Sequence, residues 1–356
     1  PMASRSGNSD ANTEVLFASP EHWLQALTKK FEYLDTLTVP VASSPAARAR
    51  EAYIQMIAGM VSGTAYGSAE KSVEIKFGPV KTPLSDFNES KRTAGLDWTY
   101  LGTTMTGKLR LRNVEELLLR VFAAKTPGGY METGVWRGGS SIYARAVIRA
   151  HGEAGARPSY VCDSFAGLPP GLWLLDTEDR GWDHCPYVEV STATVESNFR
   201  ELSLLDSNVV FVQGLFNHSM PALGTWMRPE EQLAVLRLDG DLYESTADVL
   251  YHMYSRVSVG GYIIIDDWTN FPAQRAVLDF FRIHGLNPEV LPIDSLGAYW
   301  QKLSVHEVPV QYSHYVNRIS EVRAQTDAHF KKVRESVVGS AAAGGSGVSV
   351  VVGTNA

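Results

Sequence analysis

Three aspartates lie at the ends of two short apolar runs, where their carboxylates could hold a metal ion. Asp239 ends the run Leu233–Asp239, and Asp266 and Asp267 follow the run that begins at Gly261. If the runs are neighbouring strands, the carboxylates converge at one sheet edge, where their repulsion is costly unless a cation or protons intervene. Hard oxygen ligands of this kind suit Mg²⁺, Mn²⁺ or Ca²⁺. We therefore predict a divalent-metal site at these three residues.

Helix capping is the alternative explanation for the aspartates. Asp266 and Asp267 could cap the helix expected a few residues after them. Asp239 or Asp241 could cap the helix expected from Tyr243. Each aspartate alone fits a cap, but capping does not require carboxylates on adjacent strands, so it explains the set less well.

Histidines and cysteines supply the other reactive side chains. His218 and His284 fall near the same edge and are candidate general bases, because the pKa of histidine lies near neutrality. Cys162 and Cys185 lack the paired spacing of a zinc site and are expected to be free thiols.

A glycine-rich turn, Glu132–Ser141, follows a short apolar run and opens a helical pattern. Gly134, Gly138 and Gly139 let the backbone approach a ligand closely. The spacing matches neither the dinucleotide fingerprint nor a phosphate loop. The acidic Glu132 beside the turn suits a cationic ligand such as S-adenosylmethionine, which carries an ammonium and a sulfonium group.

The next apolar run, Ser159–Asp163, ends in a carboxylate that could bind both ribose hydroxyls of such a ligand. Because ligands in open α/β sheets bind outside the carboxyl ends of the strands, the turn and Asp163 together predict one cofactor crevice. The alternative is that the glycines only satisfy turn geometry and that Asp163 begins an Asx turn.

An alternation of strand and helix patterns must position these residues. From Gly129 onward it predicts a doubly wound, mostly parallel α/β sheet of the Rossmann-like class, with both faces covered. The predicted elements are Gly129–Glu132, Ser140–Ala150, Ser159–Asp163, Val190–Leu202, Val209–Gln213, Leu233–Asp239, Tyr243–Tyr254, Gly261–Asp266, Pro272–Phe281, Glu289–Ile293 and Ala298–Leu303.

Helical patterns also precede the sheet. Glu21–Leu37, Ala52–Val61 and Leu111–Ala124 repeat apolar residues every three or four positions, which is typical of amphipathic helices. Residues 64–92 are polar and interrupted by glycine, and are predicted to be loop.

The amino-acid composition limits the classes of function that we expect for the protein. The 356 residues include 44% hydrophobic and 20% charged residues, which predicts a sizeable core. The net charge of −7, without a cluster of Lys and Arg among aromatics, argues against nucleic-acid binding. No stretch is long enough to span a membrane, and the opening run Pro1–Thr13 lacks the apolar core of a signal peptide. A cytoplasmic protein with a small-molecule partner is expected.

Several motifs, taken in order, resemble the macrocin O-methyltransferase (TylF/MycF-type) family. They are Leu111-Arg-Asn-Val-Glu-Glu-Leu, Glu132-Thr-Gly-Val-Trp-Arg-Gly-Gly, Asp163-Ser-Phe-Ala-Gly-Leu-Pro, Arg237-Leu-Asp-Gly-Asp-Leu-Tyr-Glu-Ser-Thr and Ile263-Ile-Ile-Asp-Asp. The resemblance runs from about Tyr53 to Lys302. It implies a class I methyltransferase that uses S-adenosylmethionine and Mg²⁺ (or Mn²⁺) to methylate a sugar, phenol or other natural-product hydroxyl.

The resemblance also implies roles for single residues. The metal ligands would be Asp239, Asp266 and Asp267, and Asp239 would also take the hydroxyl proton. The implied cofactor-binding residues are Glu132, Thr133, Gly134, Arg137 and Asp163. An N-terminal helical region would cover the substrate and contribute to a homodimer.

The implied organisation has five parts. They are a disordered N-terminus (1–20), a helical substrate-covering and dimerisation region (21–110), the S-adenosylmethionine-binding methyltransferase domain (111–305), a helical extension (306–338) and a low-complexity tail (339–356). The loop 171–187 and the extension depart from the family pattern, so the acceptor and the methylated position stay open. Two other functions compete: a non-catalytic S-adenosylmethionine-binding sensor or assembly protein, and an NAD-dependent reductase, which the glycine spacing disfavours.

Overall fold

The computed structural model describes residues 44–74, 83–170, 185–269 and 272–305, together with Tyr312, residues 315–317, Ser320 and Ala324. The predicted helix Glu21–Leu37, the tail 339–356 and most of the loop 171–187 lie outside the described residues. Within the described ranges, no helix is long and apolar enough to cross a membrane.

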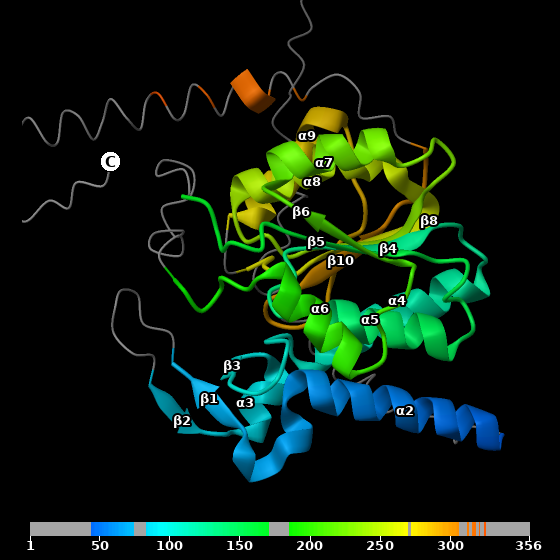
Figure 1. The fold of residues 1–356 in the computed structure, drawn as a ribbon. Coiled ribbons are helices and arrows are strands. Elements are labelled where there is room, and N and C mark those ends of the chain that lie inside the picture. The colour runs from blue at the N-terminus through cyan, green and yellow to red at the C-terminus, as the bar shows by residue number, and fades with distance from the viewer. Residues whose placement is uncertain are drawn as a thin grey trace, which may run out of the picture.

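A seven-stranded sheet forms the centre of the molecule (Figure 1). Its strand order is β6-β5-β4-β7-β8-β10-β9; the first five strands are parallel, and β10 is antiparallel to both of its neighbours. The bounds are β4 (Gly129–Thr133), β5 (Ser159–Asp163), β6 (Val209–Gln213), β7 (Leu233–Leu238), β8 (Val257–Ile265), β9 (Leu291–Pro292) and β10 (Ala298–Gln301). The predicted mostly parallel sheet is confirmed. From β4 the chain continues to β5 and β6 on one side and then crosses to β7 on the other side of β4. A crevice is expected at the carboxyl ends of β4 and β7, where the strand order reverses.

Helices cover both faces of this sheet (Figure 1). In the figure α7, α8 and α9 lie above it and α4, α5 and α6 below it. The bounds are α4 (Lys108–Ala123), α5 (Gly139–Ala150), α6 (Thr192–Glu201), α7 (Phe216–Trp226), α8 (Tyr243–Met253) and α9 (Ala273–His284), and a short 3₁₀ turn, η4 (Tyr254–Arg256), follows α8.

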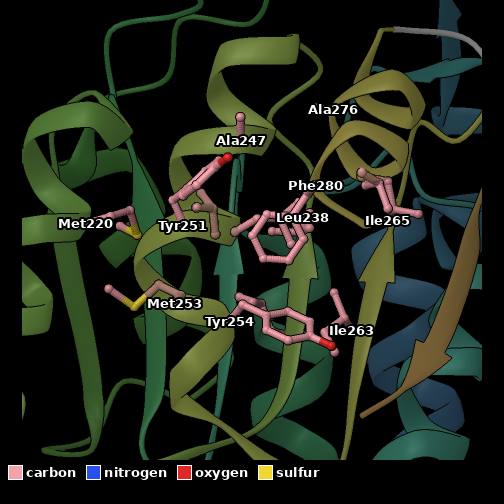
Figure 2. Close-up of a cluster of buried hydrophobic side chains, with 14 of the residues drawn as sticks. Met220, Leu238, Ala247, Tyr251, Met253, Tyr254, Ile263, Ile265, Ala276 and Phe280 are labelled. Carbon is pink, nitrogen blue, oxygen red and sulfur yellow. The ribbon is translucent and has the colours of Figure 1, made fainter. Parts of the chain in front are cut away.

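The central strands are buried on both faces. Every residue of β7 is buried, which is why this strand appears in the sequence as a nearly continuous apolar run. Figure 2 shows the core above the sheet, where side chains such as Met220, Tyr251 and Phe280 from the helices meet Ile263 from β8. The close packing of this core holds the carboxyl ends of the strands in fixed positions.

Residues 44–107 form a second, smaller unit, which differs from the loop predicted over residues 64–92. Helix α2 begins at Pro45, earlier than predicted, because the Ser44 hydroxyl accepts the Ala47 amide at 3.1 Å and proline fits the first turn. A three-stranded antiparallel sheet of order β2-β1-β3 follows. The bounds are α2 (Pro45–Ser62), η2 (Thr64–Ala69), β1 (Lys71–Val73), β2 (Leu84–Asp86), α3 (Glu89–Ala94) and β3 (Trp98–Thr99).

A buried arginine holds this small unit together. The Arg92 guanidinium lies 3.3 Å from Glu70 and 2.7 Å from Asp97, and both partner carboxylates are also buried. It donates further hydrogen bonds to the carbonyls of Ser62 and Lys71, so it joins the end of α2 to β1. These contacts fix the segment that leads into β3 within the small unit.

Replacing Arg92 with Met should destabilise the protein by about 3–5 kcal/mol, because two buried carboxylates would lose their cation. The free energy of unfolding in urea measures the effect. Arg200→Met is the matched control, since Arg200 pairs with Glu196 at 3.9 Å on an exposed helix surface and should contribute no more than about 1 kcal/mol. Equal losses in the two variants would contradict a structural role for the Arg92 ion pairs.

Candidate functional site

One cavity of about 720 Å³ lies at the carboxyl edge of the main sheet. Gly134, Asp163, Asp239 and Asp267, which the sequence placed in a shared crevice, all line it. Its volume is within the range of small-molecule sites, roughly 300–1,000 Å³.

Three carboxylates meet inside this cavity. Asp239, Asp241 and Asp267 each offer one oxygen, and these oxygens lie within 4.8 Å of one another. We call these residues the acidic group. Asp267 Oδ2 is buried and has no hydrogen-bond partner among the described residues. A buried oxygen of this kind calls for a ligand, and the three oxygens form the hard donor set that Mg²⁺ or Mn²⁺ prefers.

The electrostatics of the acidic group point the same way. Burial, followed by repulsion from Asp241 and Asp266, raises the pKa of Asp267 well above its ordinary value. Burial likewise raises the pKa of Asp239, although Arg237 opposes the shift. A bound cation would offset the repulsion within the group and stabilise the charged carboxylates.

Asp266, the third predicted ligand, also lines the cavity, but two arginines engage its carboxylate. Its carboxylate forms buried ion pairs with Arg110 and Arg237. Burial alone would raise the pKa of Asp266, but the two guanidinium groups outweigh it and hold that pKa below its ordinary value. Asp241, which the sequence suggested only as a helix cap, occupies the place in the acidic group expected for Asp266.

Arg237 is the centre of the charges beneath the cavity. It lies fully buried in β7, and its Nη1 is 2.5 Å from Asp239 Oδ2 and also paired with Glu132. Its Nη2 pairs with Asp266 and donates to the Thr106 hydroxyl at 3.2 Å. The sequence could have indicated this network, because an arginine inside an apolar run needs buried charged partners.

Negative charge exceeds positive charge around this network. Two guanidinium groups, those of Arg110 and Arg237, face six carboxyl groups in the described structure. These are Glu132, Asp239, Asp241, Asp266, Asp267 and Asp294. The excess favours a divalent cation in the cavity.

The glycine turn approaches the acidic group directly. Gly134 has a φ of 85°, and a Cβ at this position would lie 1.7 Å from the Asp239 carbonyl oxygen, so only glycine fits. Asp163 lies beside the turn and accepts the backbone amides of Val135 at 2.7 Å and Phe165 at 2.8 Å. Burial raises the pKa of Asp163, although these hydrogen bonds oppose the shift.

Glu132 lies below the turn and is not among the residues that line the cavity. Its carboxylate accepts hydrogen bonds from Tyr130, Ser140 and Ser141 and pairs with Arg237. The acidic residue next to the turn is therefore occupied by the protein itself, and it fixes the turn onto β7.

Thr133 and Arg137, the other predicted cofactor residues, also make contacts within the protein instead of lining the cavity. The Thr133 hydroxyl donates to the Arg237 carbonyl at 3.3 Å. Arg137 donates to the Tyr100 carbonyl at 2.9 Å and lies over the Trp136 ring. Arg137 thus ties the glycine turn to the small N-terminal unit.

Helix capping does not explain the aspartates. The residues that precede α8 and α9 are Leu242 and Pro272, and neither helix has a side-chain capping hydrogen bond.

The candidate histidines do not line the cavity: His218 is exposed on α7, and His284 Nδ1 is 2.9 Å from the Phe280 carbonyl on α9. Cys162 and Cys185 are free thiols, as predicted.

Unusual backbone conformations gather at the same edge. Trp136, Phe165 and Asp241, which follow β4, β5 and β7, have φ values of 48°, 53° and 58°. Positive φ in residues other than glycine costs about 1–3 kcal/mol and is found mainly at functional sites. The turns that line the cavity are therefore held in shape by their surroundings.

Comparison with known proteins identifies relatives of this chain. The family model described as Macrocin-O-methyltransferase (TylF) matches residues 33–302. The 8-demethyl-8-(2,3-dimethoxy-alpha-L-rhamnosyl)-tetracenomycin-C 4'-O-methyltransferase of Streptomyces olivaceus is 37% identical over 258 residues, which are 71% of this chain and 93% of that protein. The mycinamicin III 3''-O-methyltransferase of Micromonospora griseorubida is 38% identical over 221 residues, 61% of this chain and 85% of that protein. The solved structure of the O-methyltransferase NovP has a TM-score of 0.62 at 34% identity, and the match covers 72% of this chain and all of that one.

Replacing Asp267 with Asn should weaken Mn²⁺ binding by about tenfold or more, because the site loses a charged ligand, and tenfold corresponds to about 1.4 kcal/mol. Electron paramagnetic resonance of free Mn²⁺ measures the affinity. Asp86→Asn is the control, because the Asp86 side chain is 99% exposed and remote from the cavity lining. Unchanged affinity in Asp267→Asn would remove the acidic group from consideration as a metal site.

Proposed function

The chain belongs to the macrocin-O-methyltransferase family, and from that premise we propose that it methylates a sugar hydroxyl of a glycosylated natural product with the help of a divalent cation. Membership makes it an S-adenosylmethionine-dependent O-methyltransferase of small-molecule hydroxyl groups. One observation carries the finer proposal: the acidic group and the Gly134 turn face the same cavity.

The proposal of a sugar acceptor draws on a relative. The name of the Streptomyces olivaceus enzyme specifies a rhamnosyl group on tetracenomycin C. A cavity of about 720 Å³ lies within the size range of small-molecule sites.

The residues of the glycine turn fit the cofactor. S-Adenosylmethionine, when bound, supplies a methyl group activated by its sulfonium. Gly134 lines the cavity where the turn packs on the Asp239 carbonyl, and Asp163, which also lines the cavity, would accept the ribose hydroxyls. Glu132, Thr133 and Arg137 hold the turn in position from outside the cavity.

The acidic group fits a divalent cation, preferably Mg²⁺. When bound, such a cation would lower the pKa of the acceptor hydroxyl as a Lewis acid. Asp239 and Asp267 would hold it, and Asp266 would support Asp239 through Arg237, their shared partner. The unpartnered Asp267 Oδ2 and the excess of carboxyl groups support this assignment.

The proton of the acceptor hydroxyl needs a base within the cavity. The family resemblance assigns this role to Asp239. Arg237 already engages Asp239 Oδ2 at 2.5 Å, which leaves Asp239 one oxygen for the cation. We therefore favour Asp241, whose carboxylate lies in the same group.

Asp241→Asn should lower kcat by about 10²–10⁴, the usual contribution of a general base, and leave binding of S-adenosylhomocysteine unchanged. Transfer of a labelled methyl group to p-nitrophenyl α-L-rhamnoside and calorimetry with S-adenosylhomocysteine measure the two effects. Asp86→Asn is again the control. A wild-type kcat in Asp241→Asn would exclude Asp241 as the base.

Removal of divalent cations should abolish methyl transfer, and added Mg²⁺ should restore it, because the acidic group alone cannot polarise the hydroxyl. Full activity in EDTA would refute the metal assignment. A protein that binds S-adenosylhomocysteine but methylates no member of a broad hydroxyl panel would instead be a non-catalytic binder.

We also propose a homodimer formed through the N-terminal unit. Large exposed apolar side chains occur throughout residues 44–107, and such exposure is typical of association surfaces. They are Met56, Tyr66, Leu84, Leu96, Tyr100 and Leu101. Helix α2, which bears Met56, lies at the outer end of the molecule (Figure 1).

Light scattering should give twice the chain mass of 39.1 kDa. Met56→Glu should weaken the dimer by about tenfold or more, because a charge would enter an apolar contact. Leu303→Glu is the control, since Leu303 is 72% exposed and lies outside the N-terminal unit. A monomeric wild-type chain would contradict the proposal.

A further inference from the structure

The cavity has a wall that comes from beyond the region matched to the family. The family match ends at residue 302, whereas Tyr312, Tyr315, Val316 and Ser320 line the same cavity as the acidic group. The described residues of this segment, which we call the C-terminal wall, are helical.

Both tyrosines of the wall are anchored to α8. Tyr315 is 8% exposed, its hydroxyl donates to the Glu244 carbonyl at 3.2 Å, and its ring stacks on Tyr251 with the centroids 5.3 Å apart. The Tyr312 hydroxyl donates to Asp248 Oδ1 at 3.3 Å. These contacts place the aromatic rings at defined positions in the cavity.

The wall begins near the acidic group and extends away from it. Helix α8 starts two residues after Asp241, and its residues Glu244, Ser245 and Asp248 also line the cavity. From Glu244 to Asp248 the helix advances about 6 Å, one turn. The cavity lining therefore continues from the acidic group along one turn of α8 to Asp248, whose carboxylate accepts a hydrogen bond from Tyr312.

The wall offers aromatic and branched apolar side chains beside a few polar atoms. Tyr312, Tyr315 and Val316 provide the apolar contact, and Leu296 lines the same cavity from the loop between β9 and β10. Aromatic side chains pack well on planar rings, and a few polar groups set the orientation of a ligand.

We propose that the C-terminal wall is a subsite for an aromatic or polycyclic aglycone. The inference rests on the proposed function, because it assumes that the sugar of the same glycoside binds at the acidic group. The wall selects the acceptor by its aglycone, whereas the strand ends carry the chemistry.

Calorimetry on the full chain loaded with S-adenosylhomocysteine tests the subsite. The probes are p-nitrophenyl α-L-rhamnoside and methyl α-L-rhamnoside, which share the sugar and differ in the aglycone. We expect the wild type to bind the aryl glycoside about tenfold more tightly. Tyr312→Ala and Val316→Ser should each reduce this preference to about threefold or less, with unchanged affinity for the methyl glycoside and for S-adenosylhomocysteine.

Matched controls separate the wall from general effects. Tyr66→Ala and Val305→Ser alter exposed residues of the same types outside the cavity lining and should keep the full preference. Val316 is itself 39% exposed, so Val316→Ser should fold even if Tyr312→Ala does not. Equal binding of the two probes by the wild type, failure to bind either, or a preference that survives in the folded wall variants would overturn the subsite.

Methyl transfer, measured on the same samples, tests the proposed function separately. A preference for the aryl glycoside without transfer to either probe would reject the proposed function and leave the aromatic subsite in place. Equal binding of both probes with transfer to both would reject the subsite alone.

Discussion

A buried positive charge constrains the whole cavity edge. Arg237 lies in the interior of β7 with no exposure, and a guanidinium there is tolerated only when carboxylates surround it. Its partners Glu132, Asp239 and Asp266 come from β4, the end of β7 and the end of β8. One side chain therefore ties three adjacent strand ends together. A shift of any strand by one residue would leave charges unpaired in the core, so the network also fixes the register.

The main sheet could be predicted from the sequence because its central strands are buried on both faces and appear as apolar runs. Elements with weaker patterns were missed. Helix α7 contains Pro221 and Gly224, which interrupt helical periodicity, and no element was expected there. The small sheet has strands of only two or three residues, too short for an alternating pattern. Tertiary contacts such as those of Arg92 stabilise these strands, and no local pattern reports them.

The same distinction applies to the site. Parallel strands bring Gly134, Asp163, Asp239 and Asp267 to one edge, so their shared cavity followed from the order of the elements. The direction in which each side chain points could not be predicted from the order of the elements. Asp266 and Asp267 both line the cavity, yet the Asp266 carboxylate pairs with Arg110 and Arg237 while an oxygen of Asp267 joins the acidic group. The partners that decide this are distant in sequence, since Arg110 is 156 residues from Asp266.

This division of charges suggests how chemistry and selectivity can vary separately. The carboxylates that pair with Arg237 hold adjacent strand ends together, and a change in any of them would leave part of the buried charge unpaired. The C-terminal wall contacts α8 through Tyr312 and Tyr315. Substitutions in the wall can therefore alter which aglycone fits without altering the acidic group. A rigid edge for the reaction and a separate wall for the acceptor are what a fold needs if one chemistry is to serve many glycosides.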